Sequence, residues 1–332
     1  MFSVVIPLYN KGQTIVDTVQ SVLSQDFADF EVIIVDDGST DDGPEKVDRC
    51  FDDPRIRMIR QENLGEGAAR NAGIYAARYD LIAPLDADDE WLPGYLSEVA
   101  RAVNAFPDAG MFCCGGVGRY PDGSGIVRQS PVYGSNPSEI NYFEAPYFFG
   151  NASSIVFAKK LVPLAGAFPT AMTQQADVVF FFRLALVTKA IFCPALLSIY
   201  NLGIPGQISS DRRANASAAV GSSNQVYQFW DTLDNHFRNP ACIVAIVNNL
   251  RCGFHYPLLN SDYELINFFF TNTDERLLRE LAISERFFYP RPRLRRIALL
   301  LNRILLGLPH RISRTPSATS SQDVMQAISD SR

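Results

Sequence analysis

The chain has 332 residues, of which 47% are hydrophobic and 20% are charged, and its formal net charge is −6. This length and composition predict one large or two modest globular domains with a full hydrophobic core. The negative charge argues against a nucleic-acid partner, and no run reaches the ~18 apolar residues of a membrane-spanning helix.

The six cysteines and three histidines form no recognisable metal-binding or disulfide pattern. No CxxC pair occurs, and the histidines stand far apart at His236, His255 and His310. The chain starts at Met1 with a strand-like segment, without the basic and apolar regions of a signal peptide. We therefore expect a cytoplasmic protein with reduced thiols.

The first 85 residues alternate between strand-like and helix-like segments. Largely apolar runs predict strands at 2–8, 30–35 and 81–85, and a further short strand is predicted at 56–59. The segments between them include helical patterns at 14–23, around Val47 and at 68–76. This order predicts an α/β fold, with parallel strands and helices on both faces of the sheet.

Polar loops follow three of these strands, at Tyr9, Asp37 and Asp86. Parallel strands end at one edge of the sheet, where open α/β sheets bind ligands, so these loops are expected to converge on one crevice.

The third loop is the most acidic, with four acids within residues 86–90. Asp86 and Asp88 alternate, so in an extended backbone they would point the same way. Crowded carboxylates predict Mg²⁺ or Mn²⁺ together with substrate phosphates. The alternative is a polar turn in which Asp88 or Asp89 caps the helix that Pro93 opens.

Five motifs in order over about 100 residues carry a resemblance to a known family. They are Val5-Ile6-Pro7-Leu8-Tyr9-Asn10, Ser24-Gln25, Val35-Asp36-Asp37-Gly38-Ser39-Thr40-Asp41, Asn63-Leu64-Gly65 with Ala69-Arg70-Asn71-Ala72-Gly73, and Leu85-Asp86-Ala87-Asp88-Asp89. Together they resemble the nucleotide-sugar domain of glycosyltransferase family 2. The resemblance covers residues 1–210 and implies the GT-A fold, a Rossmann-like, mostly parallel mixed sheet with helices on both faces.

The resemblance also implies residues that bind the nucleotide-sugar donor, with a UDP-sugar expected. Pro7 and Tyr9 would line the base pocket, and Asp37 would accept a hydrogen bond from the base or ribose. Arg70 would face the diphosphate. The alternatives are that Asp37 caps the turn that follows it and that Arg70 is an ordinary surface arginine.

The resemblance assigns the metal and the donor diphosphate to Asp86 and Asp88, with Asp89 as an additional metal ligand. Which carboxylate binds the Mg²⁺ or Mn²⁺ ion directly stays open. The ion would act as a Lewis acid on the leaving nucleoside diphosphate.

The catalytic base is expected at Asp177, which opens a helix and has Arg183 six residues further on, as in the family. Ala176 stands where the family usually has a glutamate. The alternative role for Asp177 is an acid that stabilises the start of its helix through the helix dipole. With a base separate from the metal site, the resemblance implies an inverting glycosyltransferase. Its acceptor would be a glycan or lipid-linked molecule of the cell envelope.

We expect residues 1–110 to form the donor half and 111–210 the acceptor half of the catalytic domain. Residues 211–224 are predicted to be a linker, 222–308 a helical region and 315–332 a disordered tail. The arginine-rich, amphipathic segment 291–314 suits either an anionic membrane at the inner face of the plasma membrane or packing against protein. Two rival functions remain: a nucleotidyltransferase, and a non-catalytic protein that binds a sugar nucleotide.

Overall fold

The structure is a computed structural model that describes residues 1–128, 135–144, 151–204, 207, 211–235, 237–260 and 262–280. The chain divides into two compact units after Gln207. The first unit contains the sheet and the second is helical.

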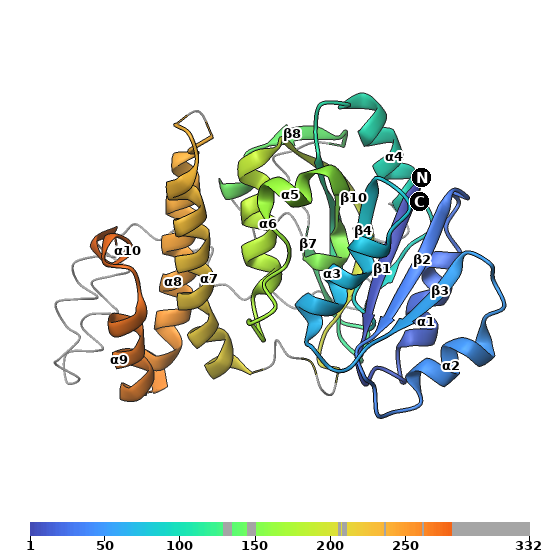
Figure 1. Ribbon diagram of the computed structural model, residues 1–332, viewed down its shortest axis with the longest axis horizontal. Coiled ribbons are helices and arrows are strands. Elements are labelled where there is room, and N and C mark those ends of the chain that lie inside the picture. The colour runs from blue at the N-terminus through green and yellow to red at the C-terminus, as the bar shows by residue number, and fades with distance from the viewer. Residues whose placement is uncertain are drawn as a thin grey trace. The chain divides into compact units, whose positions relative to one another are not determined.

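The strands of the first unit belong to one sheet (Figure 1). They are β1 (Phe2–Leu8), β2 (Phe30–Asp36), β3 (Ile56–Arg60), β4 (Leu81–Pro84), β5 (Glu90–Trp91), β6 (Met111–Arg119), β7 (Gly125–Arg128), β8 (Ser138–Ile140), β9 (Ile155–Ala158) and β10 (Ala190–Asn201). Within the described residues, the order is β3-β2-β1-β4-β9-β6-β10-β5, with β7 beside β6 and β8 beside β10.

The sheet is parallel in its first part and mixed in its second. Strand β1 runs parallel to β2 and β4, and β2 runs parallel to β3. Strand β9 is antiparallel to both of its neighbours, β4 and β6, while β6 and β10 are again parallel. The mixed, mostly parallel sheet that the sequence predicts is therefore confirmed.

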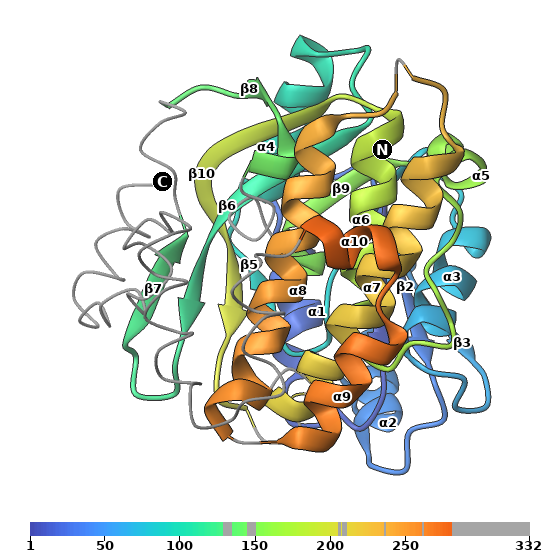
Figure 2. The same ribbon diagram turned by 90° about the vertical axis from the view of Figure 1, so that its left-hand side faces the viewer.

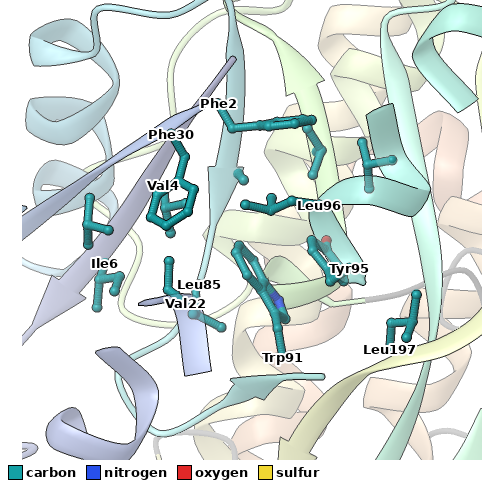
Figure 3. Packing of buried hydrophobic residues seen from close by; sticks show 14 of the residues in the cluster. Phe2, Val4, Ile6, Val22, Phe30, Leu85, Trp91, Tyr95, Leu96 and Leu197 are labelled. Carbon is teal, nitrogen blue, oxygen red and sulfur yellow. The ribbon is translucent and has the colours of Figure 1, made fainter. Parts of the chain in front are cut away.

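Helices cover both faces of this sheet. They are α1 (Ile15–Leu23), α2 (Gly43–Cys50), α3 (Glu66–Ala76), α4 (Tyr95–Ala105), α5 (Val162–Ala165) and α6 (Ala176–Val187), with single 3₁₀ turns at Tyr142–Glu144, Ala152–Ser154 and Lys159–Leu161. On one face, alternate residues of β1 pack with α1 and α4 in one buried cluster, in which Trp91 stacks on Tyr95 at 4.2 Å between ring centroids (Figure 3). Alternation along a strand places every second side chain on the same face.

Helix α3 lies against the other face, next to β1 and β2. A Cβ atom at Gly73 would collide with Val5 Cγ1 and crowd Val35 Cγ2. Glycine at this position therefore lets α3 approach the sheet closely, and this places Arg70, one turn earlier, near the ends of the strands.

The second unit consists of α7 (Arg212–Thr232), α8 (Pro240–Asn260), α9 (Tyr263–Asn272) and α10 (Glu275–Glu280). Helices α7, α8 and α9 lie side by side (Figure 2). No helix among the described residues is long and apolar enough to cross a membrane.

The prediction of a linker at 211–224 is wrong, because most of this segment belongs to α7. Asp211 caps the helix by accepting hydrogen bonds from the backbone N–H groups of Arg213 and Ala214. The small side chains that suggest a linker are instead a packing face, since Ser222 and Ser223 are buried and accept hydrogen bonds from Asn249 of α8. Segments 291–314 and 315–332 lie outside the described residues.

Candidate active site

The predicted donor residues follow the carboxyl ends of β1, β2 and β4. These three strands are parallel neighbours in the order β2-β1-β4. The backbone N–H of Asp37 donates to Leu8 O at 2.8 Å, and that of Leu85 donates to Val5 O at 2.9 Å, so the loops leave the same edge. The convergence of the three loops is thus confirmed.

Pro7 and Tyr9 stand at the end of β1. Pro7 is buried within the strand and pairs in register with Val35 of β2. Tyr9 is 45% exposed. An exposed aromatic ring beside buried strand ends is available for stacking on a flat ligand.

Asp37 organises the loop that precedes α3. One carboxylate oxygen accepts hydrogen bonds from the Leu64 N–H and the Gln61 side-chain amide, and the other accepts from the Gly65 N–H, at 2.7–2.9 Å. The adjacent turn is capped by Asp36, which accepts from Ser39 N. Asp37 is therefore held rigidly, and its carboxylate keeps lone pairs that these three bonds do not use.

Asp86 and Asp88 belong to a turn rather than to extended backbone. The Asp89 N–H donates to Asp86 O at 3.0 Å and closes the turn. Asp86 forms an ion pair with Arg70 and Asp88 one with Lys11, each at 2.6 Å. The extended backbone on which the alignment of the two carboxylates was predicted is therefore not present, because the chain turns between them.

Asp89 is fully buried, and both of its carboxylate oxygens have partners inside the protein. Ser153 Oγ donates to one, and the Asn201 N–H donates to the other at 3.1 Å. Ser153 Oγ also accepts from the Asp86 N–H. The Asp89 carboxylate therefore stabilises the acidic turn from the interior of the protein.

Arg70 is the centre of the charged network. It is 2% exposed, so the alternative of a surface arginine is wrong. Its guanidinium donates to Asp86 at 2.6 Å and to Glu66 at 2.7 Å, and its Cζ atom lies 5.3 Å from the centroid of the Phe168 ring. Burial lowers the pKa of Arg70, but the neighbouring carboxylates raise it further than burial lowers it, so Arg70 stays charged.

Asp177 lies in the first turn of α6 and is electrostatically linked to the network. Burial raises its pKa, the positive charge of Arg70 opposes that rise, and the negative charge of Asp86 adds to it. The residue before the helix, Gln175, has a left-handed backbone with φ of 60°. The structure thus brings the expected base close enough to the acidic turn for the two to influence each other.

Sequence reasoning missed Lys11, Glu66, Ser153 and Asn201. The last two lie more than 60 residues from the acidic turn, and no local pattern connects them to it. Glu66 is four residues before Arg70 on α3, the spacing of a helical ion pair, and this spacing is a signal that the sequence offers.

The carboxylate oxygens of the acidic turn are suitable ligands for a hard divalent cation. Within the described residues, no three His, Cys, Asp or Glu side chains are arranged to hold a metal ion. However, Mg²⁺ usually takes only one or two carboxylates and completes its shell with phosphates and water. Burial and Asp86 raise the pKa of Asp88 against the opposing charge of Lys11, and burial and nearby acids raise that of Glu66 to about 7. Burial is the largest cause of both shifts and the neighbouring acids add to them, so a cation bound beside these carboxylates would favour their ionised forms.

Comparisons with known proteins agree with this geometry. Residues 3–159 match the family described as Glycosyl transferase family 2. Glycosyltransferase GlyG of Streptococcus pneumoniae is 43% identical over 91 residues, which are 27% of this chain and 30% of GlyG. Succinoglycan biosynthesis protein ExoO of Rhizobium meliloti is 43% identical over 102 residues, 30% of this chain and 29% of ExoO. The chain thus matches less than a third of the length of these relatives.

Two similar solved structures share the fold at low identity. Staphylococcus aureus TarS 1–349 in complex with UDP-GlcNAc has a TM-score of 0.70 at 18% identity, covering 90% of this chain and 87% of that one. Mannosyltransferase PcManGT from Pyrobaculum calidifontis, in complex with GDP-Man and Mn²⁺, has a TM-score of 0.55 at 18% identity, covering 91% and 86%. Residues 3–159 of this chain belong to glycosyltransferase family 2, and its sheet-containing unit has the GT-A fold.

Proposed function

We propose that this protein transfers a sugar, with inversion, from a nucleoside diphosphate sugar to a hydroxyl group of an acceptor. The observation that carries the proposal is the position of Arg70. This buried cation contacts Asp86 of the donor motif and is electrostatically coupled to Asp177, the expected base. Groups for the leaving diphosphate and for the attacking hydroxyl therefore share one charged network.

The donor would bind over the ends of β1, β2 and β4. Tyr9, with its exposed ring, would stack on the base above Pro7, and Asp37 would accept a hydrogen bond from the base or ribose. Arg70 would orient Asp86 beside the diphosphate. We propose a UDP-sugar as donor, and UDP-GlcNAc and GDP-mannose are the first compounds to test because similar structures were determined with them.

A Mg²⁺ or Mn²⁺ ion would be held by Asp88 and Asp86. When bound, such an ion neutralises the charge that develops on the departing diphosphate. Asp89 is left out of this ligand set, because it is fully buried and its oxygens are directed to Ser153 and Asn201 inside the protein.

Asp177 would take the proton from the acceptor hydroxyl as that oxygen attacks the anomeric carbon. A carboxylate whose pKa is raised by burial is a stronger base than an exposed aspartate. Its place in the first turn of α6 also lets the helix dipole favour the ionised form that accepts the proton.

The acceptor would be a glycan or lipid-linked molecule of the cell envelope. The name of the similar protein ExoO, which places it in succinoglycan biosynthesis, supports a glycan product. Residues 291–314 would provide a peripheral contact with an anionic membrane at the cytoplasmic face. Loss of cosedimentation with anionic liposomes after truncation at Tyr289, with donor hydrolysis retained, would support that contact.

The rival functions predict different results in one assay. A nucleotidyltransferase would release pyrophosphate from a nucleoside triphosphate, and a non-catalytic sensor would bind the donor without consuming it. A thermal-shift screen of nucleotide sugars identifies the donor, because a ligand at ~100 times its dissociation constant adds about 2.7 kcal/mol of stability. Release of nucleoside diphosphate from that donor, with and without Mn²⁺, then distinguishes a transferase from both rivals.

A further inference from the structure

Lys11 has a fixed position in the turn that precedes α1. Its backbone carbonyl accepts hydrogen bonds from the N–H groups of Thr14 and Ile15, both at 3.0 Å. The Thr14 hydroxyl donates to Ala87 O at 2.7 Å, and Ala87 lies between the two acids of the donor motif. The start of α1 is therefore tied to the acidic turn by its backbone as well as by its charge.

The Lys11 ammonium occupies one oxygen of Asp88. Nζ lies 2.6 Å from Oδ2, and the two side chains are only 20% and 10% exposed. A charge-assisted hydrogen bond with this little solvent around it is stronger than a surface ion pair.

A divalent cation on Asp88 would have to share the carboxylate with this ammonium. Mg²⁺ binds carboxylate oxygen at about 2.0–2.1 Å, so on Oδ2 it would lie within a few ångströms of Nζ and repel it. Metal binding to Asp88 is thus opposed by a cation that the chain itself supplies.

We propose that Lys11 is a built-in counter-ion of Asp88 that makes metal binding depend on the donor. The inference rests on the proposed function. A nucleoside diphosphate brings negative oxygens to this edge of the sheet, and these offer the Lys11 ammonium a second partner. Asp88 is then released to the metal, so donor and metal bind together and the free protein holds Mn²⁺ weakly.

The chain offers a matched control in Lys46. This lysine lies beside the same loop, donates to Gly12 O at 2.8 Å and pairs with Asp42 at 3.0 Å. Its side chain is 28% exposed, and its partners are Gly12 and Asp42 rather than residues of the acidic turn. Lys46→Met therefore removes a nearby positive charge without freeing Asp88.

The test measures Mn²⁺ binding to the full-length protein by the electron paramagnetic resonance signal of free Mn²⁺, with and without UDP. Without UDP, Lys11→Met should bind Mn²⁺ at least about tenfold more tightly than the wild type, which corresponds to ~1.4 kcal/mol. Added UDP should tighten Mn²⁺ binding strongly in the wild type and in Lys46→Met, and much less in Lys11→Met. Lys11→Arg, which keeps the charge, should behave like the wild type.

Unchanged or weaker Mn²⁺ affinity of folded Lys11→Met without UDP would overturn the proposal, and so would an equal gain in Lys46→Met. Thermal melting of each variant shows whether it is folded, and Lys11→Gln replaces Lys11→Met if that variant is not. Failure of the wild type to bind any nucleotide sugar would count against the proposed donor instead. The two failures are distinguishable, because the arm that decides the role of Lys11 contains no nucleotide.

Discussion

The guanidinium of Arg70 lies 2.6 Å from the Asp86 carboxylate and joins α3 to the turn after β4. Arg70 also balances Glu66 and lowers the pKa of Asp177 against the effect of burial. One buried cation therefore supports three acids that come from separate parts of the chain.

Arg70→Met should destabilise the protein by about 1.5–3 kcal/mol, because it removes charge-assisted hydrogen bonds to Asp86 and Glu66, whose side chains are 22% and 40% exposed. Urea unfolding measures the change in the free energy of unfolding. Arg101→Met is the control: Arg101 is 53% exposed and pairs with Glu98 on α4, so its loss should cost less than about 1 kcal/mol. If the two substitutions changed the free energy of unfolding by similar amounts, Arg70 would not be what stabilises the charged network.

Asp177→Asn should lower kcat by about 10²–10⁴ while the donor dissociation constant changes little, since it removes a base and keeps the shape. The wild-type kcat should fall as pH decreases through the pKa of Asp177, which burial raises above 3.8, because the protonated acid accepts no proton. That acid limb should disappear from the residual activity of the variant. Equal loss of donor affinity would place Asp177 in the donor site instead, and normal kcat would direct the search for the base to Glu144 and Asp211.

Glu66 should make the folded protein less stable as pH rises. Burial raises its pKa from 4.5 to about 7, with Arg70 opposing and Asp86 and Asp177 adding to the rise. Between these values the folded chain holds a proton that the unfolded chain releases, so this contribution to stability is complete below about pH 4.5 and is lost as pH rises through 7. In EDTA, the stability of Glu66→Gln relative to the wild type should therefore increase from pH 5 to pH 8. Parallel stability curves would contradict this assignment.

Asn71 should matter through the loop that precedes α6. Its amide donates to Phe168 O and accepts from Phe168 N, both at 2.9 Å. Asn71→Ala leaves both backbone groups without these partners, which should cost about 1–3 kcal/mol. Asn71→Asp still accepts from Phe168 N but cannot donate to Phe168 O, so its stability should be intermediate in urea unfolding. If Asn71→Ala were as stable as the wild type, the two hydrogen bonds between Asn71 and Phe168 would not stabilise this loop.

The parallel part of the fold could be predicted because its information is local. Strands β1, β2 and β4 are largely apolar runs bounded by polar turns, and the order of strands and helices fixes the direction of the crossovers. The insertion of β9 between β4 and β6 could not be predicted from the sequence. It depends on pairings such as that of Leu81 with Ala158, which lie 77 residues apart in sequence. The same limit explains the error at 211–224, where burial against α8 decides the structure.

In the site, the sequence identified the acids but not what each acid contacts. The crowding of Asp86, Asp88 and Asp89 is visible in the motif, yet their partners depend on how the turn bends. The bend directs Asp88 to Lys11 and Asp89 into the interior towards Ser153. These three acids lie within four residues, yet each has different surroundings, which their spacing alone does not specify.

The most direct test of the account is the release of UDP from a UDP-sugar by the wild type and by Asp88→Asn, each with Mn²⁺ and with EDTA. The donor for this assay is the compound that the thermal-shift screen selects. We predict release by the wild type that requires Mn²⁺ and release by the folded variant that is nearly abolished under both conditions. Metal-independent release, or full activity of Asp88→Asn at limiting Mn²⁺, would contradict the assignment of the acidic turn to the metal and the donor.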